Sequence, residues 1–154
     1  MRLVLQRVSE ARVDVEERTV GQIGPGLVVL LGAETGDTPE QAKEAARRVA
    51  HLRIFEDPAG KMNLSISDTG GAVLAISQFT LVADLSRGRR PGFENALRPE
   101  LAKPLYEHFC DAVEISGVHV ERGIFGAYMK VSLVNDGPAT FVVDVKPPGR
   151  SEPR

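Results

Sequence analysis

The stretch Gly26-Leu27-Val28-Val29-Leu30-Leu31-Gly32 decides the fold. All the residues between its two glycines are aliphatic, and the break Gly24-Pro25-Gly26 introduces it. A run of this length without alternation of apolar and polar residues is typical of a β-strand buried on both faces. The stretch 73–82 is also apolar on both faces. The sequence therefore predicts two central strands.

Further strands are predicted on both sides of these two. Leu3 and Leu5, and later Val13 and Val15, alternate with polar neighbours, as expected for strands with one buried face. The other predicted strands cover residues 20–23, as the return of a short hairpin, 119–134 and 139–145.

Two main helices are predicted. The stretch Thr38-Pro39-Glu40-Gln41 combines an N-cap threonine, a proline at the first helical position and a glutamine at the capping-box position. Alanines follow at helical spacing, and we expect this helix to end near Arg53. Pro99 opens the second helix, which we expect to run to about Ile115. Pro104 removes a backbone donor within it, so a delayed start or a kink is expected.

Length and composition indicate one globular domain. The chain has 154 residues, 42% of them hydrophobic and 26% charged, which excludes the disordered and membrane-embedded classes. Several strands with two helices make a mixed α/β or α+β domain. We expect this domain to cover residues 1–146. The tail, residues 147–154, lacks core-forming residues and is expected to be disordered.

The single cysteine bears on the compartment. Cys110 cannot form an internal disulfide, which suits a reducing environment, and its apolar neighbours at helical spacing predict a core position. The N-terminus does not resemble a signal peptide, and no segment approaches the ~20 apolar residues that span a bilayer. We therefore expect a cytoplasmic protein without a membrane partner.

Charge limits the ways in which this protein can bind nucleic acid. The net charge is −2, whereas proteins that wrap nucleic acid nonspecifically are usually basic. A contact with RNA must therefore use a local patch. The densest group of arginines comprises Arg87, Arg89, Arg90 and Arg98. The alternative is a solvated loop, since the stretch 84–93 also contains two glycines and a proline.

No familiar catalytic or metal site is evident. The histidines His51, His108 and His119 do not lie at metal-ligand spacing from one another or from Cys110, so structural or exposed positions are expected. The sequence has no nucleophile elbow, phosphate loop or dinucleotide fingerprint. We expect neither a metal nor a cofactor.

Two polar stretches interrupt the apolar pattern. Ser77-Gln78-Phe79-Thr80 lies in the predicted strand 73–82, and burying a polar side chain without a partner costs about 1–3 kcal/mol. Its side chains either bond to nearby backbone, lie at an exposed strand end, or serve a function. Asn135-Asp136-Gly137-Pro138, followed by Ala139-Thr140, separates two apolar stretches and predicts a hairpin turn.

Together the two stretches resemble motifs of the D-aminoacyl-tRNA deacylase family, which carries SQFTL and NxGPxT. They stand here as residues 77–81 and 135–140. The resemblance runs in register from Met1 to about Val145. Other stretches that look like the family are Gln6-Arg7-Val8, Gly26 to Gly32, Arg53-Ile54-Phe55, Gly60-Lys61-Met62-Asn63, Arg90-Pro91 and Met129 to Val134.

The resemblance implies a single domain with a largely antiparallel, barrel-like sheet and a homodimer with active sites at the subunit interface. In the family the Gly-Pro bond is cis, and the pair enters the partner's site. The carbonyls of Gly137 and Pro138 would then face the α-amino group of the substrate and exclude an L-side chain by collision. Arg7 resembles the family residue that holds this pair. Asn135 and Thr140 are expected to support it.

The implied reaction is hydrolysis of the ester in D-aminoacyl-tRNA, and of glycyl-tRNA mischarged on tRNA-Ala, because glycine has no side chain to exclude. The resemblance suggests that backbone N–H groups near Phe79 and Thr80 stabilise the oxyanion. The terminal 2′-hydroxyl of the tRNA would help to activate water. Thr80 is expected to position the substrate and Gln78 to shape the pocket, and Ser77 is counted with them among the catalytic residues. Met129 either lines the pocket or only packs against neighbouring strand residues.

Arg87, Arg89 and Arg90 are the candidates for tRNA contact, and no contact with DNA is expected. Three departures from the family pattern, at Gly92, Tyr128 and Pro104, lie outside both motifs. Two alternatives remain open. One is a related enzyme that removes L-amino acids mischarged on tRNA, against which the full SQFTL motif and the Gly-Pro pair argue. The other is a non-catalytic module that binds tRNA or protein.

Overall fold

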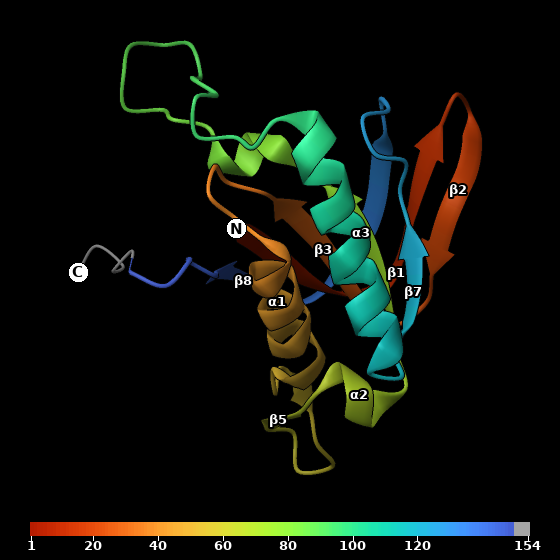
Figure 1. Ribbon diagram of the computed structural model, residues 1–154. Helices are drawn as coiled ribbons and strands as arrows, with labels where there is room; N and C mark the ends of the chain where they lie inside the picture. The colour runs from red at the N-terminus through yellow and green to blue at the C-terminus, as the bar shows by residue number, and fades with distance from the viewer. Residues whose placement is uncertain (150–154) are drawn as a thin grey trace.

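The computed structural model describes residues 1–149 as one layer of helices on a strongly curved sheet (Figure 1). The strands are β1 (Arg2–Val15), β2 (Arg18–Ile23), β3 (Gly26–Gly32), β4 (Phe55–Glu56), β5 (Met62–Leu64), β6 (Ala72–Ser77), β7 (His119–Arg122) and β8 (Lys130–Asp144). The helices are α1 (Pro39–His51), the short α2 (Ile66–Thr69), the 3₁₀ helix η1 (Phe79–Val82) and α3 (Pro99–Ile115). The predicted disorder covers residues 147–154, of which 150–154 lie outside the described range.

The main sheet has the order β2-β1-β3-β6-β7, and β8 pairs with β1. The long strand β1 pairs with β3 and then β2 along one edge and with β8 along the other, always antiparallel. The pairs β3–β6 and β6–β7 are parallel. The result is a mixed α/β domain with a nearly closed, barrel-like sheet, as predicted.

The apolar stretch 27–31 forms the middle of β3, and all but Leu30 are buried, which confirms a strand covered on both faces. On one side, β3 packs against α1 and α3, which bury Val49 and Phe109 completely. On the other side, Val28 joins a smaller cluster with Val8 and Leu74. The helices therefore occupy one face, as Figure 1 shows for α1 and α3.

The predicted start of α1 is confirmed in detail. Gln41 accepts a hydrogen bond at Oε1 from the backbone N–H of Thr38 over 2.8 Å, which completes the capping box. The helix ends at His51, close to the expected end near Arg53. Helix α3 begins at Pro99 without delay and contains Pro104. Pro104 lies just beyond the first turn, so it removes one backbone hydrogen bond close to the start of the helix.

Three strand predictions are wrong. The predicted strand 73–82 ends at Ser77, and η1 follows it. The predicted strand 119–134 is divided, because β7 ends at Arg122 and β8 begins at Lys130. The predicted hairpin at 135–138 lies inside the continuous strand β8. In this last case the turn-forming residues make a bulge, since β1 pairs with β8 on both sides of them.

No helix within residues 1–149 is long and apolar enough to cross a bilayer.

Candidate active site

The SQFT segment begins where β6 ends. Ser77 pairs with Leu31 of β3, and Gln78 donates its backbone N–H to the Leu31 carbonyl over 2.7 Å before the chain turns into η1. The side chain of Gln78 donates from Nε2 to Oγ1 of Thr80. Thr80 and Phe79 are exposed. The polar residues therefore lie at an exposed strand end, one of the positions expected from sequence.

The turn leaves two backbone donors without an acceptor. Within residues 1–149, the N–H groups of Phe79 and Thr80 make no hydrogen bond, whereas those of Leu81 and Ala83 bond to Gln78 and Thr80 over 3.3 and 3.2 Å. Free N–H groups are expected at the start of any helix. Two such donors beside an exposed hydroxyl could receive an oxyanion.

The loop 123–129 lies beside β6, the strand that leads into this turn, and of its residues the sequence indicated only Met129 as a site residue. Gly123 donates to the carbonyl of Ala75 over 3.0 Å, which fixes the loop beside β6. Met129 is half-buried and packs on the smaller apolar cluster, which contains Ile76. Tyr128 is 84% exposed. The sequence pattern of residues 119–134 predicted one continuous strand, so no local signal indicated a loop at 123–129.

The second motif forms the bulge of β8. Gln6 pairs with Thr140 and Val8 with Asn135, so residues 136–139 lie opposite Arg7 alone. The Gly137–Pro138 peptide bond is cis, and both residues are exposed.

Arg7 and Asn135 hold this bulge from two sides. The buried guanidinium group of Arg7 donates from Nε to the carbonyl of Asp136 over 2.9 Å and from Nη1 to that of Ile54 over 2.8 Å. Asn135 accepts at Oδ1 from the N–H of Ala139 over 2.7 Å and donates from Nδ2 to Oγ1 of Thr140 over 3.0 Å. The exposed pair thus lies between residues that side-chain hydrogen bonds hold in place.

The two motifs do not meet within one chain. Ser77 lies in register with Leu31 and, through it, with Leu3, whereas the bulge lies opposite Arg7. This offset is about 13 Å along β1, and β6 and β8 are about 14 Å apart across three strand spacings.

The arginine-rich loop lies close behind the SQFT motif in the chain, after η1. Asp84 and Gly92 exchange backbone hydrogen bonds of 2.8 and 2.9 Å, which close the loop containing Arg87, Arg89 and Arg90. The three side chains are exposed, and the loop projects from the body of the molecule (green in Figure 1). Two hydrogen bonds from Ser86 lower the pKa of the Asp84 carboxyl group. The bond from the side chain of Ser86 has the larger effect, and the bond from its backbone N–H has the smaller one.

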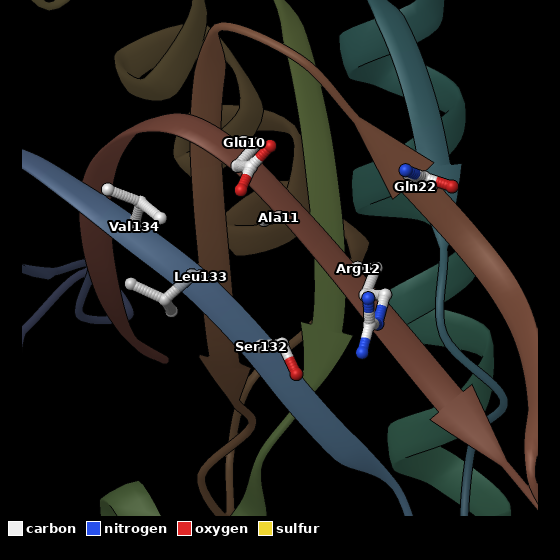
Figure 2. Close-up of a pocket in the computed structure, with 7 residues that line it drawn as sticks. All are labelled: Glu10, Ala11, Arg12, Gln22, Ser132, Leu133 and Val134. Carbon is white, nitrogen blue, oxygen red and sulfur yellow. The ribbon is translucent and has the colours of Figure 1, made fainter.

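Two surface hollows lie away from both motifs. A groove between β1, β2 and β8 has a volume of about 160 Å³ and is lined by Glu10, Ala11, Arg12, Gln22, Ser132, Leu133 and Val134 (Figure 2). A second, of about 410 Å³, lies between α1 and the end of β8. Neither contains a predicted site residue. The histidines are all exposed, and no cluster of metal-ligating residues occurs within residues 1–149.

Comparison with known proteins gives a consistent result. The family model described as D-Tyr-tRNA(Tyr) deacylase matches residues 4–144. A protein of Symbiobacterium thermophilum is 57% identical over 94% of this chain and 95% of its own length. A protein of Halalkalibacterium halodurans is 56% identical over 95% of this chain and 100% of its own length. Both are named D-aminoacyl-tRNA deacylase.

Two solved structures share the fold. One, titled c-Myc DNA Unwinding Element Binding Protein, has a TM-score of 0.89 and 34% identity and covers 96% of this chain and 100% of its own. The other, titled as a probable eukaryotic D-amino acid tRNA deacylase, has a TM-score of 0.82, covers 94% and 98% of the two chains, and is 20% identical. The second likeness concerns the fold alone.

Proposed function

This chain belongs to the D-Tyr-tRNA(Tyr) deacylase family, and on that premise we propose that it hydrolyses the ester between a D-amino acid and tRNA. The observation that carries the proposal is the family match across residues 4–144, which includes both polar motifs intact. Its place of action is then the cytoplasm, where tRNA is charged and used.

The proposed chemistry uses η1 and the tRNA itself. The N–H groups of Phe79 and Thr80, which lack acceptors within residues 1–149, receive the oxyanion that develops when water attacks the ester carbonyl. The 2′-hydroxyl of the terminal ribose assists the water. The Thr80 hydroxyl, held by Gln78, positions the acyl group, and Ser77 and Met129 shape the pocket.

The proposed discrimination between D- and L-substrates comes from a second copy of the chain. Gly137 and Pro138 are exposed and lie too far from Thr80 to share a site with it in the same chain. In a homodimer, their carbonyls reach the partner's η1 and hold the substrate's α-amino group. An L-side chain collides with them, whereas hydrogen does not, so glycyl-tRNA formed on tRNA-Ala is also hydrolysed.

The proposed tRNA contacts are Arg87, Arg89 and Arg90. Their loop connects directly to the proposed catalytic turn, and exposed guanidinium groups pair well with phosphates.

Hydrolysis is tested with D-tyrosyl-tRNA, L-tyrosyl-tRNA and glycyl-tRNA-Ala by following the loss of the acyl group. We expect rapid cleavage of the first and third and none of the second. Cleavage of neither tyrosyl ester would favour a binding module, and preferential cleavage of the L-ester would favour the related editing activity. An excess of duplex DNA serves as competitor, because one structural relative is titled as a DNA-binding protein. We expect no inhibition.

The shared site is tested by mixing two strongly impaired variants, Thr80→Val and Gly137→Ala. If the site joins Thr80 of one chain to Gly137 of the other, each mixed dimer contains one intact site. Random mixing would then restore about a quarter of wild-type activity. If both residues acted within one chain, the mixture would be no more active than the two variants measured separately.

A further inference from the structure

We infer that Phe79 and Phe93 form a stacking platform for the unpaired nucleotides that precede the terminal adenosine of tRNA. This inference rests on the proposed function and adds a second subsite to it. Phe93 lies outside both family motifs.

The two rings form a continuous apolar surface beside the proposed catalytic turn. Their centroids lie 5.1 Å apart, and the planes are tilted by 57°. Phe79 is 59% exposed and Phe93 42% exposed. Large aromatic side chains on an otherwise polar surface commonly mark a binding site, because their exposure to water is unfavourable.

Phe93 is held independently of Phe79. Its carbonyl accepts from the N–H of Ala96 over 3.1 Å, and Leu97 donates to the carbonyl of Ala33 over 3.0 Å. These bonds fasten the segment that follows Phe93 to the end of β3. The platform therefore joins two separately anchored segments, and its spacing is set by the fold.

Charge around the rings favours single-stranded RNA as the occupant. Arg87, Arg89 and Arg90 immediately precede the Pro91-Gly92 step before Phe93, and within residues 1–149 none of the three forms an ion pair. The nearest acidic side chain in the following sequence is Glu94. Aromatic faces beside unpaired guanidinium groups suit stacked bases with an adjacent phosphate backbone.

The place of the platform fits the substrate. The ester is on the last nucleotide, whose ribose must lie at Thr80 for hydrolysis. The preceding nucleotide then lies next to Phe79, the neighbour of Thr80 in the chain. The 3′ end of tRNA is unpaired there, so its bases are free to stack.

The first test compares two esters, D-tyrosyl-tRNA and D-tyrosyl-adenosine, which lacks all preceding nucleotides. For Phe93→Leu, we expect the ratio of kcat/KM for the tRNA to kcat/KM for the adenosine ester to fall about tenfold, within the range of one base–aromatic stack. The control is Ile115→Leu, at an exposed position at the far end of α3, which should leave the ratio unchanged. An unchanged ratio for Phe93→Leu would overturn the inference.

A second test does not depend on catalysis. Uncharged tRNA is compared with the same tRNA lacking its last three nucleotides, and the dissociation constants are measured by fluorescence anisotropy. Wild-type protein should bind the intact tRNA more tightly, and Phe93→Leu should remove most of that difference. Equal affinities in the wild type would overturn the platform even if the esters are hydrolysed. If the esters are not hydrolysed but the difference is present, the proposed function fails and the platform stands.

The competing occupant is a second copy of the chain. Light scattering on Phe93→Leu and the wild type at several concentrations distinguishes the two. The same mass for both proteins supports an RNA platform. A loss of dimer on substitution would show that the rings are buried between copies and would overturn the inference.

Discussion

Arg7 donates a hydrogen bond of 2.9 Å from Nε to the backbone carbonyl of Asp136, although 128 residues separate them in the chain. Its Nη1 donates to Ile54. One buried side chain thereby joins β1, the segment after α1 and the bulge of β8. This contact reaches the residue that directly precedes the exposed Gly137–Pro138 pair.

Replacing Arg7 with lysine should damage both stability and activity. A lysine cannot supply two fixed donors in a fork, so at least one buried carbonyl loses its partner. We expect the free energy of unfolding to fall by about 2 kcal/mol in urea titrations, and kcat/KM for D-tyrosyl-tRNA to fall at least tenfold. Arg12→Lys, at an exposed position on the same strand, is the matched control. Full activity in Arg7→Lys would contradict the positioning role.

Gly137→Ala should disturb the bulge through contact with Arg7. A Cβ at this position would lie 2.8 Å from Nη2 of Arg7, and the φ angle of +144° is unfavourable for alanine. We expect the free energy of unfolding, measured by thermal denaturation, to fall by about 1–3 kcal/mol. Most of the deacylase activity should also be lost. Gly36→Ala is a control for the cost of placing alanine at a positive φ angle. The φ angle of Gly36 is +98°, and no atom lies within 4 Å of the added Cβ. Equal losses of activity in both variants would show that the contact with Arg7 is unimportant.

The hydroxyl of Thr80 should matter more than its methyl group. Thr80→Val removes the group that accepts the bond from Gln78, and we expect kcat to fall about 100-fold with little change in KM. Thr80→Ser keeps the hydroxyl and should retain most of kcat. Thr19→Val, which removes an exposed hydroxyl on β2, should be fully active. The role assigned to Thr80 would be wrong if the serine and valine variants were equally impaired.

Asp37 should be a strong contributor to stability. Its fully buried carboxylate lies 2.8 Å from the α-amino nitrogen of Met1, which is buried as well. Asp37→Asn removes the nearer and more deeply buried of the two carboxylates that face that ammonium group, since Glu34 lies 3.8 Å from it. The substitution should lower the free energy of unfolding by about 3 kcal/mol. Asp111→Asn breaks an exposed pair with Arg122, and its effect should stay below about 1 kcal/mol. Similar losses in the two variants would contradict this account.

Cys110 should be unreactive in the folded protein. Burial raises the pKa of its thiol to about 11, so at pH 8 only about one thiol in a thousand is ionised. Iodoacetamide should therefore modify Cys110 slowly in buffer and rapidly in urea, when the core opens. A cysteine placed at the exposed position of Ser116, in a Cys110→Ser background, supplies the rate for an accessible thiol. Equally rapid modification of native Cys110 would refute its burial.

Much of the fold follows from local sequence. The aliphatic run 27–31 specifies a buried strand because no polar residue offers a face to water. Thr38, Pro39 and Gln41 specify the start of α1 because their side chains and fixed φ angle act within one turn. The SQFT and NDGPAT stretches were identified because polar and turn-forming residues stand out against apolar neighbours.

The tertiary structure decided the geometry of the site. The signals of a hairpin and of a bulge are alike at residues 135–138, and only the register of β8 on β1 distinguishes them. No local pattern could place Arg7 beneath Asp136 or Phe93 beside Phe79, because these contacts join residues that are distant in the chain. Sequence by itself thus determined which residues are unusual and where several elements begin. The pairing of β1 with β2, β3 and β8 decided how the bulge of β8 meets Arg7, since strand register acts through many weak pairings at once.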